Sequence, residues 1–103
     1  MIPRSAAISF TATGDTTVVA IPASGSIKVY GISFSVNAAT TVTFKDTAAN
    51  SFSGAFRLTG DGSSITLPVI PEWVWFHCQP GRGFVISTSS NVAVGGTIWY
   101  LLG

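Results

Sequence analysis

The sequence predicts an all-β protein: a single-domain, two-sheet antiparallel sandwich, built as a jelly roll of about eight strands. Val, Ile, Thr, Phe and Trp, which fit a pleated surface, dominate a chain that has few helix formers. Turn residues recur at short intervals, and apolar and polar residues alternate between them. Many short strands of this kind favour a sandwich or barrel, and their unequal connections favour a jelly roll over an immunoglobulin fold.

The chain of 103 residues has room for one domain, so residues 1–103 are assigned to a single sandwich. Residues 1–7 are expected to form a loose N-terminal arm. Turn residues then separate about eight or nine short strands. In order along the chain, the expected strands are 5–12, 16–21, 26–36, 40–45, 52–59, 63–69, 73–78, 83–88 and 92–102.

Alternation along each strand assigns one of its faces to the core. In the third strand Tyr30, Ile32, Phe34 and Val36 form the inward set, and Gly31 leaves a flat spot on the outer face. The same rule gives core faces to the other strands: Ile8 and Phe10, Val42 and Phe44, Phe52, Phe56 and Leu58, Ile65, Leu67 and Val69, and Phe84 and Ile86.

Two segments, 73–76 and 98–102, are apolar on both faces. In a two-sheet sandwich, something beyond the opposite sheet must cover such a strand. Either loops of the same chain lie over these outer faces, or the strands line a subunit interface. The interface is the preferred interpretation, because no connection is long enough to cover much. Its residues are Trp73, Trp75, Trp99 and Leu101.

An exposed stripe of Trp99 and Leu101 would favour self-association, with Ile98, Tyr100 and Leu102 in the core. A homotrimer is the expected state, since a ring closes without leaving an open edge. A twofold dimer would cover the stripe equally well.

Charge is scarce, because Asp, Glu, Lys and Arg make up only 9% of the chain and the net charge is +1. No basic patch for nucleic acid or anionic lipid is therefore expected. The N-terminus lacks the pattern of a signal peptide, and no apolar run has the length of a membrane span. A single cysteine, Cys78, cannot form an internal disulfide, which favours synthesis in a reducing cytosol.

The sequence predicts no enzyme, metal site or cofactor. His77 and Cys78 are neighbours, but adjacent residues of a strand point to opposite faces, so they cannot act as a base and nucleophile pair. Metal-ligand spacings do not occur, and the segment 60–64 indicates a hairpin turn. Trp73 and Trp75 share a face of the expected strand, an arrangement that could also stack on a sugar.

Three segments carry a family resemblance: 25–35 (GSIKVYGISFS), 39–46 (ATTVTFKD) and 91–100 (NVAVGGTIWY). In this order, with a strand SITLP before the last, they resemble small jelly-roll proteins of tailed bacteriophages, namely head decoration or cement proteins and related fibre modules. The resemblance implies a trimer seated on the major capsid protein. The arm would reach along a neighbouring shell subunit, so one capsid contact is expected at Arg4. Independently of the resemblance, the segment 79–83 indicates a turn, and a second contact is expected there at Arg82, which stands between two glycines that leave it open to a partner.

The leading expectation is a virion structural protein, made in the bacterial cytoplasm, that binds the outer surface of a phage head and stabilises it. The alternative is a receptor-binding or carbohydrate-binding module of a phage fibre or spike.

Overall fold

The computed structural model describes residues 2–103, and the side chains from Arg4 onward. Met1, the first residue of the expected arm, lies outside the described residues. This part of the chain contains strands and loops and no helix, and therefore no helix that could span a membrane. The strands are β1 (Ile2–Val19), β2 (Ile27–Val36), β3 (Thr40–Asp46), β4 (Phe56–Leu58), β5 (Ser64–Leu67), β6 (Phe76–His77) and β7 (Phe84–Leu102).

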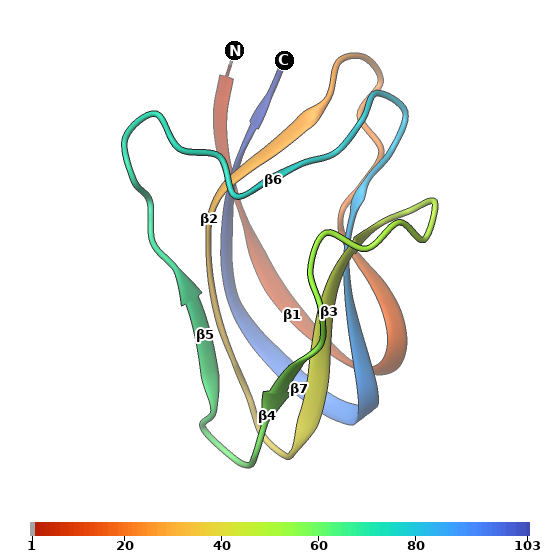
Figure 1. Ribbon diagram of the computed structural model, residues 1–103, viewed down its shortest axis with the longest axis vertical. Coiled ribbons are helices and arrows are strands. Elements are labelled where there is room, and N and C mark those ends of the chain that lie inside the picture. Colours follow the sequence, from red (N-terminus) through yellow and green to blue (C-terminus); the bar gives the residue numbers. More distant parts are fainter. Residues whose placement is uncertain (1) are drawn as a thin grey trace.

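The two longest strands, β1 and β7, form an antiparallel ribbon along their whole length, from the pair Ile2 and Leu102 to the pair Val19 and Phe84. The ribbon bends sharply, so that its two halves rise side by side in Figure 1. This corrects the expected break between the strands 5–12 and 16–21, where the chain instead continues as one strand with an irregularity in register. Gly14 has φ +87°, which glycine adopts readily, and so the strand can bulge here without ending.

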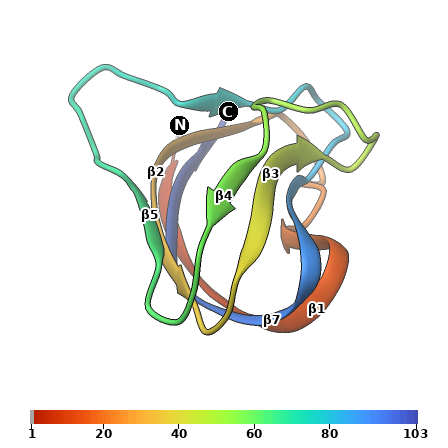
Figure 2. The same cartoon turned by 60° about the horizontal axis from the view of Figure 1, so that its bottom comes forward.

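The remaining strands flank this ribbon. β2 pairs with the second half of β7 and β3 pairs with its first half, which gives the order β4-β3-β7-β2-β5. β1 lies on the other side of β7, and β6 pairs with β2. The bend and the β2–β3 hairpin curl the strands into a compact, nearly closed sheet (Figure 2).

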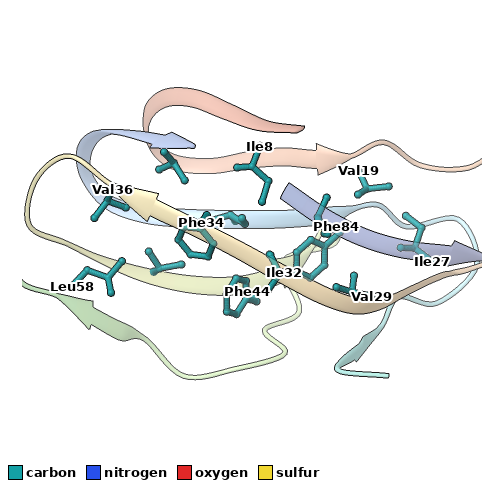
Figure 3. Packing of buried hydrophobic residues seen from close by; sticks show 14 of the residues in the cluster. Ile8, Val19, Ile27, Val29, Ile32, Phe34, Val36, Phe44, Leu58 and Phe84 are labelled. Atoms are coloured by element: carbon teal, nitrogen blue, oxygen red, sulfur yellow. The ribbon is translucent and has the colours of Figure 1, made fainter. Parts of the chain in front are cut away.

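The inner face of the curled sheet forms one hydrophobic core (Figure 3). The alternation rule correctly placed Ile8, Ile32, Phe34, Val42 and Phe44 in it. The rings of Phe34, Phe56, Phe76 and Phe84 surround that of Phe44, with centroids 5.0–6.1 Å from it. Since burying a large apolar side chain stabilises a fold by roughly 1.5–3 kcal/mol, this core is its main source of stability.

The inward assignment of Tyr30 was wrong. An irregularity between Val29 and Gly31 shifts the register of β2 against β7. The parity of the strand therefore changes, and Tyr30 lies on the outer face, where it lines a cleft. The outer flat spot at Gly31 is filled: a Cβ built there would lie 2.7 Å from Cγ2 of Val69 and 3.2 Å from Cε3 of Trp99.

Three expected strands are much shorter than the pattern indicated. Only Phe56–Leu58 of 52–59, Ser64–Leu67 of 63–69 and Phe76–His77 of 73–78 form strand. The expected N-terminal arm, in contrast, belongs from Ile2 onward to β1 and pairs with β7.

Candidate functional site

The segment Pro68–Trp75, which we call the 68–75 loop, connects β5 to β6, and both of these strands pair with β2. Two hydrogen bonds fix its C-terminal end. The backbone N–H of Trp75 donates to the carbonyl oxygen of Val29 at 2.8 Å, and its indole Nε1 donates to that of Pro68 at 2.9 Å. The second bond ties the end of the loop back to its beginning, so the loop has a defined shape.

A tight turn forms the middle of the loop. The N–H of Trp73 donates to the carbonyl oxygen of Ile70 at 3.1 Å, with Pro71 and Glu72 between them. Glu72 has φ +63°, in the left-handed region that side chains other than glycine and asparagine rarely adopt. Proline followed by a residue of positive φ is the arrangement of a type II turn.

The loop presents four large apolar side chains to solvent. Their exposed fractions are 53% for Val69, 44% for Ile70, 53% for Trp73 and 38% for Val74. We call these four residues the apolar patch.

The apolar patch borders a cleft of about 370 Å³. Tyr30 and Leu101 line the cleft from the sheet, and Glu72 is the one charged residue in its lining. Within the described part of the chain, such a concave apolar surface is typical of a binding site.

The four predicted interface residues gather in this region, but they are not equally accessible. Trp73 is exposed, whereas Trp75, Trp99 and Leu101 are half-buried. The ring centroids of Trp73 and Trp75 lie 5.9 Å apart, with ring planes at 79°. Val69 lies against Gly31 beside Trp99, so the 68–75 loop partly covers the outer face of β7. The threefold association of a bare Trp99–Leu101 stripe stays a prediction.

The two predicted capsid-contact residues differ in their surroundings. Arg4 lies exposed on β1. Arg82 forms an ion pair, because its Nη1 lies 3.2 Å from Oδ2 of the buried Asp46. A capsid contact at either residue stays a prediction, and Arg82 also has a structural partner that the sequence did not suggest.

Asp46 organises the turn that follows β3. Its Oδ1 accepts hydrogen bonds from the backbone N–H groups of Ala48 and Asn50, and its Oδ2 accepts from the side-chain amide of Asn50. Burial acts to raise the pKa of this carboxyl, but the hydrogen bonds from Asn50, Arg82 and Ala48 outweigh it, so the pKa lies below its ordinary value.

The His77–Cys78 neighbourhood contains one contact that the sequence did not reveal. The Ser26 hydroxyl lies 3.1 Å from Nε2 of His77 and donates to the carbonyl oxygen of Gly103 at 2.9 Å. Because Ser26 is buried and its proton is directed at a carbonyl oxygen, the contact joins β6 to the end of β7 and does not activate a nucleophile.

Cys78 is fully buried. Burial, and secondarily the charge of Asp46, raises the pKa of its thiol to about 12, so the reactive thiolate is scarce at neutral pH. Among residues 2–103, the His, Cys, Asp and Glu side chains form no group that could hold a metal ion.

A second cleft, also about 370 Å³, lies where β3 and β4 meet β7. Most of its lining residues are serine or threonine, and Arg57 is its one charged residue. Two of the hydroxyls hold backbone groups: Oγ1 of Thr40 accepts the N–H groups of Ser89 and Ser90, and Oγ of Ser89 accepts that of Thr41. These bonds hold the bend of β7 against β3, which is a structural role.

Comparisons with protein-family models, with curated proteins and with solved structures return no match for this chain.

Proposed function

We propose that this chain is a virion structural protein that binds the outer surface of a phage head, as a decoration or cement protein, through the apolar patch. The single observation that carries the proposal is the apolar patch itself. Its side chains are exposed although its backbone is held by defined hydrogen bonds. Contiguous exposed apolar surface on a protein so poor in charge is typical of a protein interface.

We further propose that the chain is a jelly roll. In that fold a long hairpin of eight strands wraps around a core, so that the first strand pairs with the last, the second with the seventh, and so on inward. Because the ribbon bends, β1 and β7 can each be counted as two strands. The two halves of β1 then pair with the two halves of β7 as the two outer pairs of the hairpin. β2 pairs with β5 as the third pair, and β3 pairs with β4 as the fourth.

The mechanism of such a protein is mechanical. The 68–75 loop is ordered before it binds, so binding does not require the ordering of a flexible segment. Trp73 and Ile70 would enter apolar pockets of a shell subunit, each contributing roughly 1.5–3 kcal/mol by burial. Contacts repeated around the head would oppose the outward pressure of the packed genome. The proposal contains no catalytic step and no cofactor.

Co-sedimentation with shells of the parent phage that lack this protein tests the proposal. We expect the wild-type chain to bind the shells and Trp73→Glu to lose at least tenfold in affinity. Ile21→Glu is the matched control, because Ile21 is equally exposed, at 56%, but does not line the patch cleft. Failure of the wild-type chain to bind, or equal binding by both variants, would contradict the proposal.

The receptor or carbohydrate module remains the second candidate, and one observation favours it: the exposed Trp73 and the acidic Glu72 line the same cleft. A sugar face stacked on the Trp73 ring could donate hydroxyl hydrogen bonds to Glu72. The angle of 79° between the Trp73 and Trp75 rings argues against a shared flat platform. Saturable binding on a glycan array that disappears in Trp73→Ala would favour this candidate.

A further inference from the structure

The outer edge of β1 is an extended row of unpaired backbone groups. β1 has 18 residues, and among the described strands it pairs with β7 alone. The other flanking strands are short: β4 has 3 residues and β5 has 4. An edge of this length offers N–H and C=O groups to any strand that approaches it.

This edge lacks the features by which proteins prevent edge pairing. The stretch 5–13 contains no charged residue and no proline, and its register with β7 is unbroken as far as Ala12. The residues on its outer face are small: Ser5, Ala7, Ser9 and Thr11 are all exposed. A partner strand could therefore approach without obstruction.

The residue order of this stretch is nearly the same in both directions about Ser9. On the inner face, Ala6 and Ala12 are small and equidistant from Ser9, with the large Ile8 and Phe10 between them. Ile8 is buried, while Ala6 and Phe10 are only partly buried against the core. A strand of this kind is complementary to a second copy of itself running antiparallel.

We propose that two copies of the chain associate through antiparallel pairing of β1 with β1, about a twofold axis at Ser9. Ala6 then lies opposite Ala12 of the second copy, Ala7 opposite Thr11, and Ile8 opposite Phe10. A β-branched residue opposite an aromatic one is a favourable cross-strand pair. The sheet becomes continuous across both copies, in the order β5-β2-β7-β1 followed by β1-β7-β2-β5.

Charge does not oppose this register. Arg4 of one copy lies opposite Gly14 of the other, at both ends of the paired segment. No two like charges are placed opposite each other. This pairing uses the β1 edge and leaves the apolar patch for a different partner, and it predicts a dimer instead of the expected trimer.

Cysteine substitution tests the register. Ser9→Cys places two thiols opposite each other, within the Cα separation that a disulfide requires, and should cross-link into a dimer under mild oxidation. Thr11→Cys is the matched control, because its thiol lies opposite Ala7 and should remain free. The native Cys78 is buried and should not interfere. Equal cross-linking by the two variants would overturn the proposal.

Charge substitution tests the association without cross-linking. Native mass spectrometry at micromolar concentration should show a dimer for the wild-type chain. Ser9→Lys and Ser9→Glu should each be monomeric, because like charges meet at the axis, and an equimolar mixture should form a heterodimer. A wild-type monomer or trimer, or dimers of Ser9→Lys alone, would overturn the proposal.

Discussion

Two aromatic regions of the molecule contrast in what surrounds them. In the core, the rings of Phe44 and Phe84 stack with centroids 6.0 Å apart, and both residues are fully buried. In the 68–75 loop, the rings of Trp73 and Trp75 lie at a similar separation of 5.9 Å, but Trp73 is half exposed. Burial of the Phe rings stabilises the fold, whereas backbone hydrogen bonds hold the loop. Contact between aromatic rings therefore does not by itself identify core residues.

The largest expected effect separates the two regions directly. Phe44→Ala should lower the free energy of unfolding by about 3–5 kcal/mol, because it leaves a cavity among packed rings. Trp73→Ala should lower it by no more than about 0.5 kcal/mol, as expected for a surface substitution. Urea denaturation followed by circular dichroism measures both. Similar losses in the two variants would show that the 68–75 loop belongs to the folding core.

A glycine substitution tests how closely β2 approaches β7. A Cβ on Gly96 would meet the backbone oxygen of Ser33 and the Cα of Phe34, neither of which can move freely. Gly96→Ala should therefore cost about 1–3 kcal/mol of unfolding free energy, and more if β2 separates from β7. Gly60→Ala is the control, because its Cβ would meet no atom within 4 Å. If both variants unfold at the same urea concentration, β2 and β7 do not approach each other closely at Gly96.

The Asp46 turn contributes to the free energy of unfolding in a pH-dependent way, whereas the apolar patch does not. Because the folded pKa of Asp46 is below its ordinary value of 3.8, its contribution is fully present above that pH and is lost as pH falls through the folded pKa. Asp46→Asn should cost about 1–3 kcal/mol at pH 7, through weakened bonds to Ala48 and Arg82. The difference from wild type should shrink below pH 4, as thermal unfolding across pH can show. A constant difference would mean that the carboxylate charge is not what matters.

The smallest effect concerns the turn of the 68–75 loop. Glu72 has positive φ, so Glu72→Gly should relieve strain and raise the unfolding free energy by up to about 1 kcal/mol. Gly62→Ala makes the opposite change, at φ +83° and with no atom within 4 Å of the added Cβ, and should lower it by a similar amount. Differential scanning calorimetry resolves both shifts. A destabilised Glu72→Gly would show that the Glu72 side chain holds the loop by contacts.

Sequence patterns predicted the parts of the fold that depend on local alternation. Val42 and Phe44 alternate with polar residues and are buried as expected, and so are Ile32, Phe34 and Val36. The rule failed at Tyr30, because a single irregularity of register inverts the faces of a strand. It also failed at Val69, which was expected in the core but is 53% exposed, because β5 ends at Leu67.

Other errors arose because tertiary partners decide what a turn residue does. Gly14 resembles a turn signal, as does the stretch 89–91 between the strands expected at 83–88 and 92–102, yet both lie within the β1–β7 ribbon. Gly96 lies inside a strand as expected, but no local pattern reveals the close approach of β2 there.

The candidate site was predicted in part. The sequence marked Trp73 and Trp75 as unusual, since they interrupt the alternation, but it placed them on a strand. Residues 73–75 lie in a loop because β2 accepts only the short β6 as a neighbour there. The contribution of Val69 and Ile70 to the apolar patch depends on how the loop folds back to Pro68, a contact between residues that share no sequence pattern.

The most direct test of the central claim, that the apolar patch binds a phage shell, is a cryo-electron microscopy map of the parent particle. We expect density for this chain on the outside of the head, with Trp73 and Ile70 of the 68–75 loop against the shell protein. A map of the complete particle without this chain on the shell, or with the loop facing solvent, would contradict it.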